Sequence, residues 1–199
     1  LEGIIADRRV RAVNLTGSDL AGSKVAALAG RELKTAVMEL GGSDPFVVLD
    51  DADVDLAVKE GTRGRNINAG QACVSAKRFI VAESIADEFE TKLAESVGSL
   101  VVGDPTDPAT QVGPLARPDL VDTLREQVEQ SIAAGAEALV GGFEHDGPGS
   151  FVEPLVLTGV EPQMRVFREE TFGPVAAVVR VPDEEAAIAA ANDSDFGLG

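Results

Sequence analysis

The only cysteine of the 199-residue chain, Cys73, lies in the stretch NINAGQACVSAKR, where its neighbours are mostly small. A thiolate is a nucleophile, and a helix that begins beside it or a neighbouring base would activate it. Free cysteine is also among the residue types most often buried, and it is usually inert there. The residues alone therefore leave two interpretations open, a packing residue and a catalytic nucleophile.

Two residues are candidates for a base that serves Cys73. His145 is the only histidine and lies in the hydrophilic turn FEHDGPGS, so a cysteine–histidine pair has weak support. Glu39 is the one carboxylate of KTAVMELGG, at the point where an apolar strand runs into two glycines. Burial of a carboxylate there would raise its pKa toward that of a useful general base; the alternative is that Glu39 simply points to solvent at the end of the strand. Both interpretations of Glu39 stay open.

Two other motifs have residue types suited to binding. TGSDLAG, residues 16–22, is a strand–turn–helix junction whose free backbone N–H groups favour a phosphate, although it lacks the G-x-G-x-x-G fingerprint. REETFGPV, residues 168–175, places two carboxylates and an aromatic ring just before a strand. No metal site is expected, because one cysteine and one histidine cannot form a zinc site.

The composition is strongly acidic, with 17 Lys and Arg against 34 Asp and Glu and a formal net charge of −17. This charge argues against nucleic acid or an anionic membrane as a partner, since phosphates would be repelled. A single cysteine cannot form an internal disulfide, and no apolar run approaches the ~18 residues of a membrane span. These features predict a cytoplasmic protein without a nucleic-acid or membrane partner.

Strand-like and helix-like segments alternate along the chain. A strand is expected over 11–17, followed by a helix over 18–30 with Ser18 as N-cap and Gly30 as C-cap. Further strands are expected at 33–40, 46–50, 77–83, 137–142, 151–160 and 174–182, and further helices from 53 and at 84–98, 119–134 and 183–192. This alternation predicts an α/β fold with a mainly parallel sheet covered on both faces.

The chain resembles the aldehyde dehydrogenase superfamily in four motifs that follow one another in the order found there. They are LTGS at 15–18, ELGGSDPFVVLDDADVDLA at 39–57, NAGQACVSAKR at 68–78 and EETFGPV at 169–175. Within that superfamily, ELGGSDPF, GPLARPDL and FGPVAAVVRV are most similar to the bacterial succinate-semialdehyde dehydrogenases.

The resemblance implies oxidation of an aldehyde with NAD or NADP, and it assigns a role to each candidate. Cys73 would attack the aldehyde carbon, and hydride transfer to the nicotinamide would leave a thioester that Glu39 hydrolyses by activating water. For the cofactor, the resemblance implies contacts with the pyrophosphate, the nicotinamide amide and the nicotinamide ribose, made by Gly17, Ser18, Leu40, Gly41, Glu170 and Phe172. A small semialdehyde is the implied substrate, and no histidine is needed.

The resemblance also implies a division into domains. Residues 1–41 would be the C-terminal part of a Rossmann-like NAD(P)-binding domain, and residues 42–199 a catalytic domain that is incomplete at its C-terminus. The segment alone is expected to be inactive, because half of the cofactor site would be missing. The parent protein would be a homo-oligomer, either dimer or tetramer. Ser75 stands where many semialdehyde enzymes have a second cysteine, which excludes a disulfide switch at that position.

Two alternatives remain open. The chain would be a folded fragment or pseudoenzyme that keeps the site without activity, or a thiol acyltransferase or esterase that uses Cys73 and Glu39 without hydride transfer.

Overall fold

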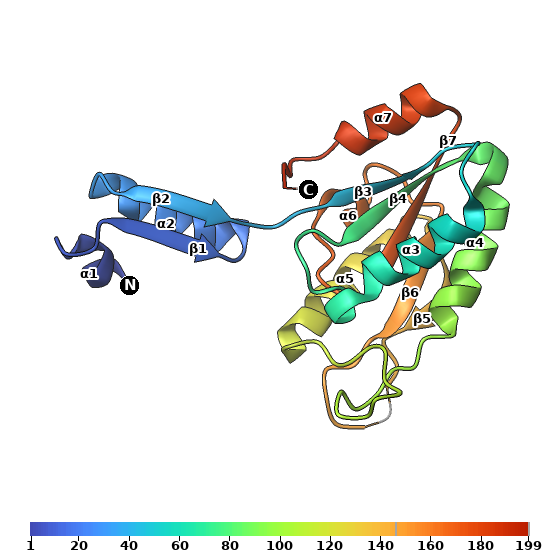
Figure 1. The fold of residues 1–199 in the computed structure, drawn as a ribbon, viewed down its shortest axis with the longest axis horizontal. Coiled ribbons are helices and arrows are strands. Elements are labelled where there is room, and N and C mark those ends of the chain that lie inside the picture. The colour runs from blue at the N-terminus through green and yellow to red at the C-terminus, as the bar shows by residue number, and fades with distance from the viewer. Residues whose placement is uncertain (146, 199) are drawn as a thin grey trace. The chain divides into compact units, whose positions relative to one another are not determined.

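The computed structural model describes residues 1–145 and 147–198, and these form two compact units (Figure 1). The first unit is residues 1–42 and the second is residues 43–197. Each unit has its own parallel strand pairing, and each is described by itself below. No helix in the described part of the chain is long and apolar enough to cross a membrane.

The first unit is a short β-α-β arrangement. Its elements are α1 (Glu2–Ala6), β1 (Ala12–Thr16), α2 (Asp19–Arg31) and β2 (Thr35–Glu39). The two strands are parallel, and their register places Thr16 opposite Glu39. Ser18 is the N-cap of α2, as expected, and its hydroxyl oxygen accepts a hydrogen bond from the Ala21 N–H at 3.4 Å.

The predicted C-cap of this helix is wrong. Gly30 lies inside α2, and the cap is Glu32. The left-handed residue that follows it is Leu33, with φ of 52°. The Lys34 N–H then donates to the Ala29 carbonyl and the Leu33 N–H to the Gly30 carbonyl, which satisfies the free carbonyl groups of the last turn. These two hydrogen bonds offset the strain of a left-handed leucine, so no glycine is needed at this turn.

The second unit is a five-stranded sheet with helices on both faces. The strand order is β3-β4-β7-β6-β5, and only the β5–β6 pair is antiparallel. The strands are β3 (Asp44–Val48), β4 (Ala76–Ala82), β5 (Glu137–Gly142), β6 (Glu153–Thr158) and β7 (Val175–Val181). The helices are α3 (Val54–Asn66), α4 (Glu83–Gly98), α5 (Pro118–Ala133), α6 (Arg165–Arg168) and α7 (Glu184–Asn192), with a short 3₁₀ turn at Ile67–Gly70. The predicted α/β class with a mainly parallel sheet is therefore confirmed.

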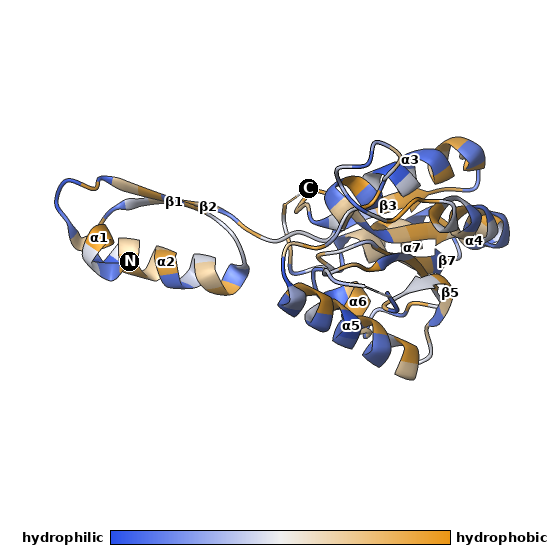
Figure 2. Cartoon of the chain, turned by 90° about the horizontal axis from the view of Figure 1, so that it is seen from below, coloured by the Kyte–Doolittle hydropathy of each residue, from blue (hydrophilic) through white to orange (hydrophobic). Residues whose placement is uncertain are grey.

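Alternate residues of the central strands contact different helices. Phe79 and Val81 of β4 pack in one apolar cluster with residues of α3 and α4, whereas Ile80 packs on the opposite face with Ala187 of α7. A third cluster joins β6 and β7 to α5 and α6. In Figure 2 the central strands are mostly orange and the helices around them carry both blue and orange bands. This is the pattern of a sheet buried between amphipathic helices.

The strand order decides which loops meet. Because β4 and β7 are adjacent and parallel, the segments that precede them emerge at the same edge of the sheet. These segments are residues 68–75 and 169–174, which contain the NAGQAC and EETFGP motifs. The start of β3 lies beside the start of β4, with Asp44 opposite Ala76. Two motifs a hundred residues apart are thus brought together at the amino ends of the strands.

Arg78, which lies on the same face of β4 as Ile80, stabilises the amino ends of these strands. Its side chain is 1% exposed, and its guanidinium donates hydrogen bonds to the Ser43 carbonyl at 2.8 and 3.1 Å. It also donates to the carbonyls of Ala190 and Ala191 at the end of α7, at 2.8 and 3.0 Å. One buried cation therefore ties the start of β3 to the last turn of α7.

Candidate active site

Cys73 lies in a turn between the 3₁₀ helix and β4, with its thiol free and its side chain half-buried. The three residues Asn68, Ala69 and Gly70 all have left-handed backbone angles, with φ of 53°, 53° and 73°. A left-handed alanine is strained, and such strain is found most often where a functional group is held in an unusual position. The turn that presents Cys73 is therefore shaped by the structure around it.

No helix starts beside Cys73 in this described segment. The residues after Cys73 run within three positions into β4, which begins at Ala76, and α3 has already ended at Asn66. The chain enters the sheet here, so no free helical N–H groups face the thiol. The positive group beside Cys73 comes instead from a side chain, that of Lys77.

Lys77 is fully buried under the turn and donates three hydrogen bonds to it. Its Nζ lies 2.9 Å from the Cys73 carbonyl oxygen and 3.2 Å from those of Ala72 and Ser75. Burial, together with the charge of Arg65, lowers the pKa of Lys77 to about 8, while Glu170 and other anions oppose the change. The site thus contains an ammonium group that titrates near neutral pH.

Arg65, on the last turn of α3, is the second buried cation of the cluster. It is 1% exposed, and its Nη2 donates to the Gly70 carbonyl at 2.6 Å. Burial lowers its pKa to about 10, and the charge of Glu170 opposes that change. Arg65 and Lys77 together hold the carbonyl groups on both sides of the Cys73 turn.

The two carboxylates of EETFGPV have different surroundings. Glu169 accepts hydrogen bonds from Arg165 at 2.6 and 2.8 Å and from Gln127 at 2.9 Å. The Arg165 guanidinium therefore holds the pKa of Glu169 below its usual value. Glu170 acts on the charges of Arg65 and Lys77, and Phe172 is half-buried. Of the two, it is Glu170 that belongs to the electrostatic surroundings of Cys73.

Gln71 connects the Cys73 turn to the segment before α5. Its side-chain amide donates to the Asn68 carbonyl at 3.0 Å, and Asn68 in turn donates to the Gln71 carbonyl at the same distance. The Gln71 side-chain oxygen accepts the Ala116 N–H at 2.8 Å. These hydrogen bonds hold the Pro/Gly-rich stretch GPLARPD against the turn that contains Cys73.

The other five predicted residues gather at the carboxyl ends of β1 and β2 in the first unit: Gly17, Ser18, Glu39, Leu40 and Gly41. The Gly17 N–H donates to the Glu39 carbonyl at 3.0 Å. The Gly41 N–H donates to the Asp19 side chain at 3.3 Å. Leu40 packs so closely on Gly22 that a Cβ there would lie 2.4 Å from it. The turn, the helix start and the glycine pair therefore form one structural group.

The Glu39 side chain is exposed in this structure. This exposure agrees with the interpretation in which the Glu39 carboxylate points to solvent. Gly17 has open space around it, and Ser18 and Asp19 at the start of α2 are exposed. The start of this 13-residue helix is therefore accessible to a phosphate group.

His145 is exposed and its ring lies 4.4 Å from that of Phe151. This agrees with a solvated turn and gives no support to a cysteine–histidine pair. Within residues 1–145 and 147–198, no group of three or more metal-ligating side chains is placed to hold a metal ion.

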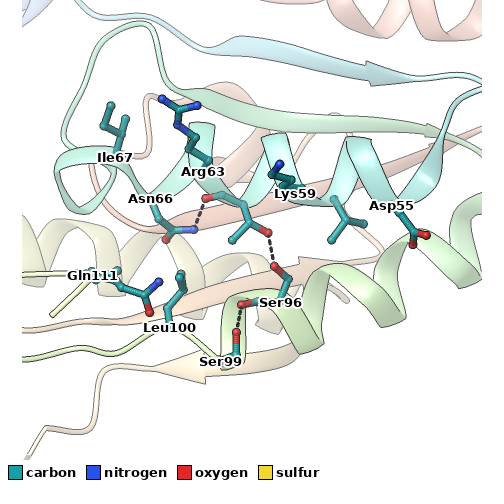
Figure 3. A pocket seen from close by; sticks show the side chains of 12 residues that line it. Asp55, Lys59, Arg63, Asn66, Ile67, Ser96, Ser99, Leu100 and Gln111 are labelled. Carbon is teal, nitrogen blue, oxygen red and sulfur yellow. Dashed lines mark hydrogen bonds between the residues drawn. The ribbon is translucent and has the colours of Figure 1, made fainter. Parts of the chain in front are cut away.

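A pocket of about 590 Å³ opens between α3, α4 and residues 99–112 (Figure 3). A hydrogen bond of 2.9 Å between the hydroxyls of Thr62 and Ser96 joins its two walls. Asn66 donates to the Thr62 carbonyl at 2.8 Å. None of the predicted site residues lines this pocket among the residues described, so the hollow is separate from the Cys73 cluster.

The whole chain, residues 1–199, matches the aldehyde dehydrogenase family, and it belongs to that family. It is 50% identical over its full length to the succinate-semialdehyde dehydrogenase (NADP(+)) of Deinococcus radiodurans. It is also 50% identical over 98% of its length to the succinate semialdehyde dehydrogenase (NAD(P)+) Sad of Escherichia coli strain K12. The chain spans 42% of the length of each of these relatives.

Solved structures of the family match the fold closely. The succinate-semialdehyde dehydrogenase from Burkholderia pseudomallei superimposes with a TM-score of 0.95 at 40% identity, over 98% of this chain and 41% of that one. The succinic semialdehyde dehydrogenase from Streptococcus pyogenes, solved in complex with NADP+, gives 0.95 at 41% identity, over 99% of this chain and 43% of that one.

Three residues of the Cys73 cluster were not predicted as functional: Arg65, Gln71 and Lys77. A signal for Lys77 was present, because KR at 77–78 opens a strand that is otherwise apolar. Charged residues at the start of a buried strand are costly unless something pairs with them. Which groups pair with them depends on the strand order, which the local sequence does not contain.

Proposed function

We propose that the protein containing this chain oxidises a small semialdehyde, succinate semialdehyde or a close analogue, to the carboxylic acid with NAD or NADP. The observation that carries the proposal is the 50% identity, over all 199 residues, to an enzyme named for this reaction. The overall reaction takes up water and the aldehyde, reduces the dinucleotide by one hydride and releases one proton.

The chain's own residues support a division of labour. Cys73 is a half-buried free thiol in a turn held from beneath by Lys77 and Arg65, so its sulfur can attack an aldehyde carbon from a fixed position. The Cys73 backbone N–H is a candidate donor to the oxyanion that forms. Glu39 is the proposed base that activates water to hydrolyse the thioester on Cys73.

The cofactor residues fit the chemistry of a dinucleotide. The accessible start of α2, at Gly17 and Ser18, suits the pyrophosphate, and the backbone at Leu40 and Gly41 suits the carboxamide of the nicotinamide. Glu170 suits the ribose hydroxyls, and Phe172 packs against the same region. When bound, the dinucleotide supplies the hydride acceptor.

The test follows NAD(P)H absorbance with succinate semialdehyde, in the polypeptide that carries residues 1–199 in its host. Cys73→Ala is expected to abolish turnover. Glu39→Gln is expected to give one equivalent of NAD(P)H and then stall, because the thioester forms but is not hydrolysed. His145→Ala is the matched control and is expected to retain wild-type turnover.

Two results would contradict the proposal. A steady rate in Glu39→Gln would remove Glu39 from its role. Hydrolysis of a p-nitrophenyl ester by Cys73, with no NAD(P)H formed from any semialdehyde, would favour the thiol esterase instead.

A further inference from the structure

We propose that Lys77 is a positioning residue for the Cys73 nucleophile, holding its turn by three carbonyl oxygens and placing a positive charge beside the thiolate. The catalytic meaning of this inference rests on the proposed function. Its geometric basis, and the experiment that tests it, do not require aldehyde oxidation.

The geometry matches the chemistry of an ammonium group. Lysine Nζ has three N–H donors on a compact point charge, and each has one acceptor within a single turn, from Ala72, Cys73 and Ser75. The Ala72 carbonyl also accepts a hydrogen bond from the Ser75 N–H at 3.2 Å, so Lys77 reinforces a turn that the backbone already closes in part. Lys77 therefore fixes the direction of the backbone on both sides of the Cys73 side chain.

The charge itself needs an explanation beyond packing. Lys77 has no exposed surface, and burial of an ammonium group costs several kcal/mol even when it is partly compensated. Its three hydrogen-bond acceptors are neutral carbonyls. An apolar side chain of similar length would fill the same space without that desolvation cost. The positive charge close to the thiol is therefore what needs a functional explanation.

The charged groups that act on Lys77 belong to α3, β3, the loop before β7 and the Cys73 turn. Arg65 of α3 disfavours its charged form, whereas Glu170 of the loop before β7, Asp44 of β3 and Cys73 favour it. The attraction between the Lys77 ammonium and the Cys73 thiolate is mutual. Because the pKa of Lys77 is lowered to about 8, this attraction is present at neutral pH and is lost as the pH rises above that value.

The test is the rate at which iodoacetamide alkylates Cys73 as a function of pH. Cys73 is the only cysteine of the 199 residues, so mass spectrometry of the peptide that contains it follows this thiol by itself. Lys77→Met is expected to slow alkylation about tenfold near pH 6.5, because the turn loses three hydrogen bonds and the positive charge close to the attacking sulfur. Near pH 9.5 the two rates are expected to agree within about twofold, because wild-type Lys77 is then largely neutral.

Two further variants make the result specific. Lys77→Gln keeps amide donors but has no charge, and it is expected to follow Lys77→Met at low pH; it also carries the test if Lys77→Met does not fold. Lys59→Met removes one exposed charge from α3 and is expected to follow the wild type at every pH.

A wild-type rate near pH 6.5 in both Lys77 variants would overturn the inference. So would a reduction by the same factor at every pH, which is the result expected of a purely structural residue. The assay contains no aldehyde and no dinucleotide, so its outcome is independent of the proposed oxidation. A protein without dehydrogenase activity that still shows the pH-dependent difference would retain Lys77 as the positioning residue of a different thiol reaction.

Discussion

Gly70 lies directly against the backbone of Gly173, so closely that a Cβ on Gly70 would stand 2.3 Å from the Gly173 carbonyl carbon and oxygen. Gly70 belongs to the turn that precedes β4 and Gly173 to the loop that precedes β7. The contact therefore joins the NAGQAC motif, which contains Cys73, to the EETFGPV motif, which contains Glu170. Neither backbone can move away without disturbing the two central strands of the sheet, β4 and β7.

Gly70→Ala is expected to lower the free energy of unfolding by at least about 2 kcal/mol. A left-handed alanine is strained by roughly 1–2 kcal/mol, and the clash with backbone atoms adds to this cost. Urea denaturation measures the change, and Cys73 alkylation reports whether the turn is displaced. The matched control is Gly64→Ala on α3, where the nearest atom to the new Cβ lies 3.9 Å away. That variant is expected to be neutral or more stable by up to about 1 kcal/mol; equal losses in both would contradict the contact.

Arg78→Met is expected to destabilise the second unit by about 2–4 kcal/mol, because it leaves buried carbonyl groups without a donor. The carbonyl groups affected belong to Ser43, Ala190 and Ala191, so the loss should be concentrated at the start of β3 and the end of α7. Hydrogen exchange over residues 184–192 is the direct measurement. The control Arg63→Met removes a largely exposed arginine and is expected to change stability by less than about 0.5 kcal/mol. Unchanged protection of α7 in Arg78→Met would refute the role of this arginine.

Stability is expected to rise with pH between about 8 and 10.5 through Lys77. Burial lowers the folded-state pKa of Lys77 to about 8, from 10.5 in the unfolded chain. In this interval the unfolded chain binds more protons than the folded one, so the free energy of unfolding increases with pH. The measurement is urea denaturation of wild type and Lys77→Met across the interval. The difference between them isolates Lys77, and a difference that is constant with pH would contradict the shift.

Gln71→Ala is expected to loosen the Cys73 turn while it costs only about 1 kcal/mol of stability. The variant loses the hydrogen bond that Gln71 donates to the Asn68 carbonyl and the one that it accepts from the Ala116 N–H. Faster hydrogen exchange over residues 67–75 and 114–117 is the expected result. Gln163→Ala, an exposed site before α6, serves as the control and should leave both segments unchanged.

The order of elements could be predicted from the sequence because hydrophobic periodicity and capping residues are local properties. The strand at 137–142, the N-cap Ser18 and the start of a helix near Asp53 are where the pattern placed them. The end of α2 was missed because two backbone hydrogen bonds stabilise a left-handed Leu33, although leucine is not a residue that marks such a turn. A helix start beside Cys73, one of the two ways to activate the thiol, is not found, since the chain there enters the sheet.

The sequence by itself determined the residue types available for chemistry: one thiol, a carboxylate before two glycines, a phosphate-type turn and a pair of acidic residues before a strand. Only the tertiary structure decided which of these lie together and what surrounds them. It placed Glu170 rather than Glu169 close to the charges of Arg65 and Lys77, and it buried Lys77 beneath the Cys73 turn. The reason is physical: adjacency follows from the pairing of β4 with β7, and charge burial follows from packing, and both depend on residues far apart in the chain.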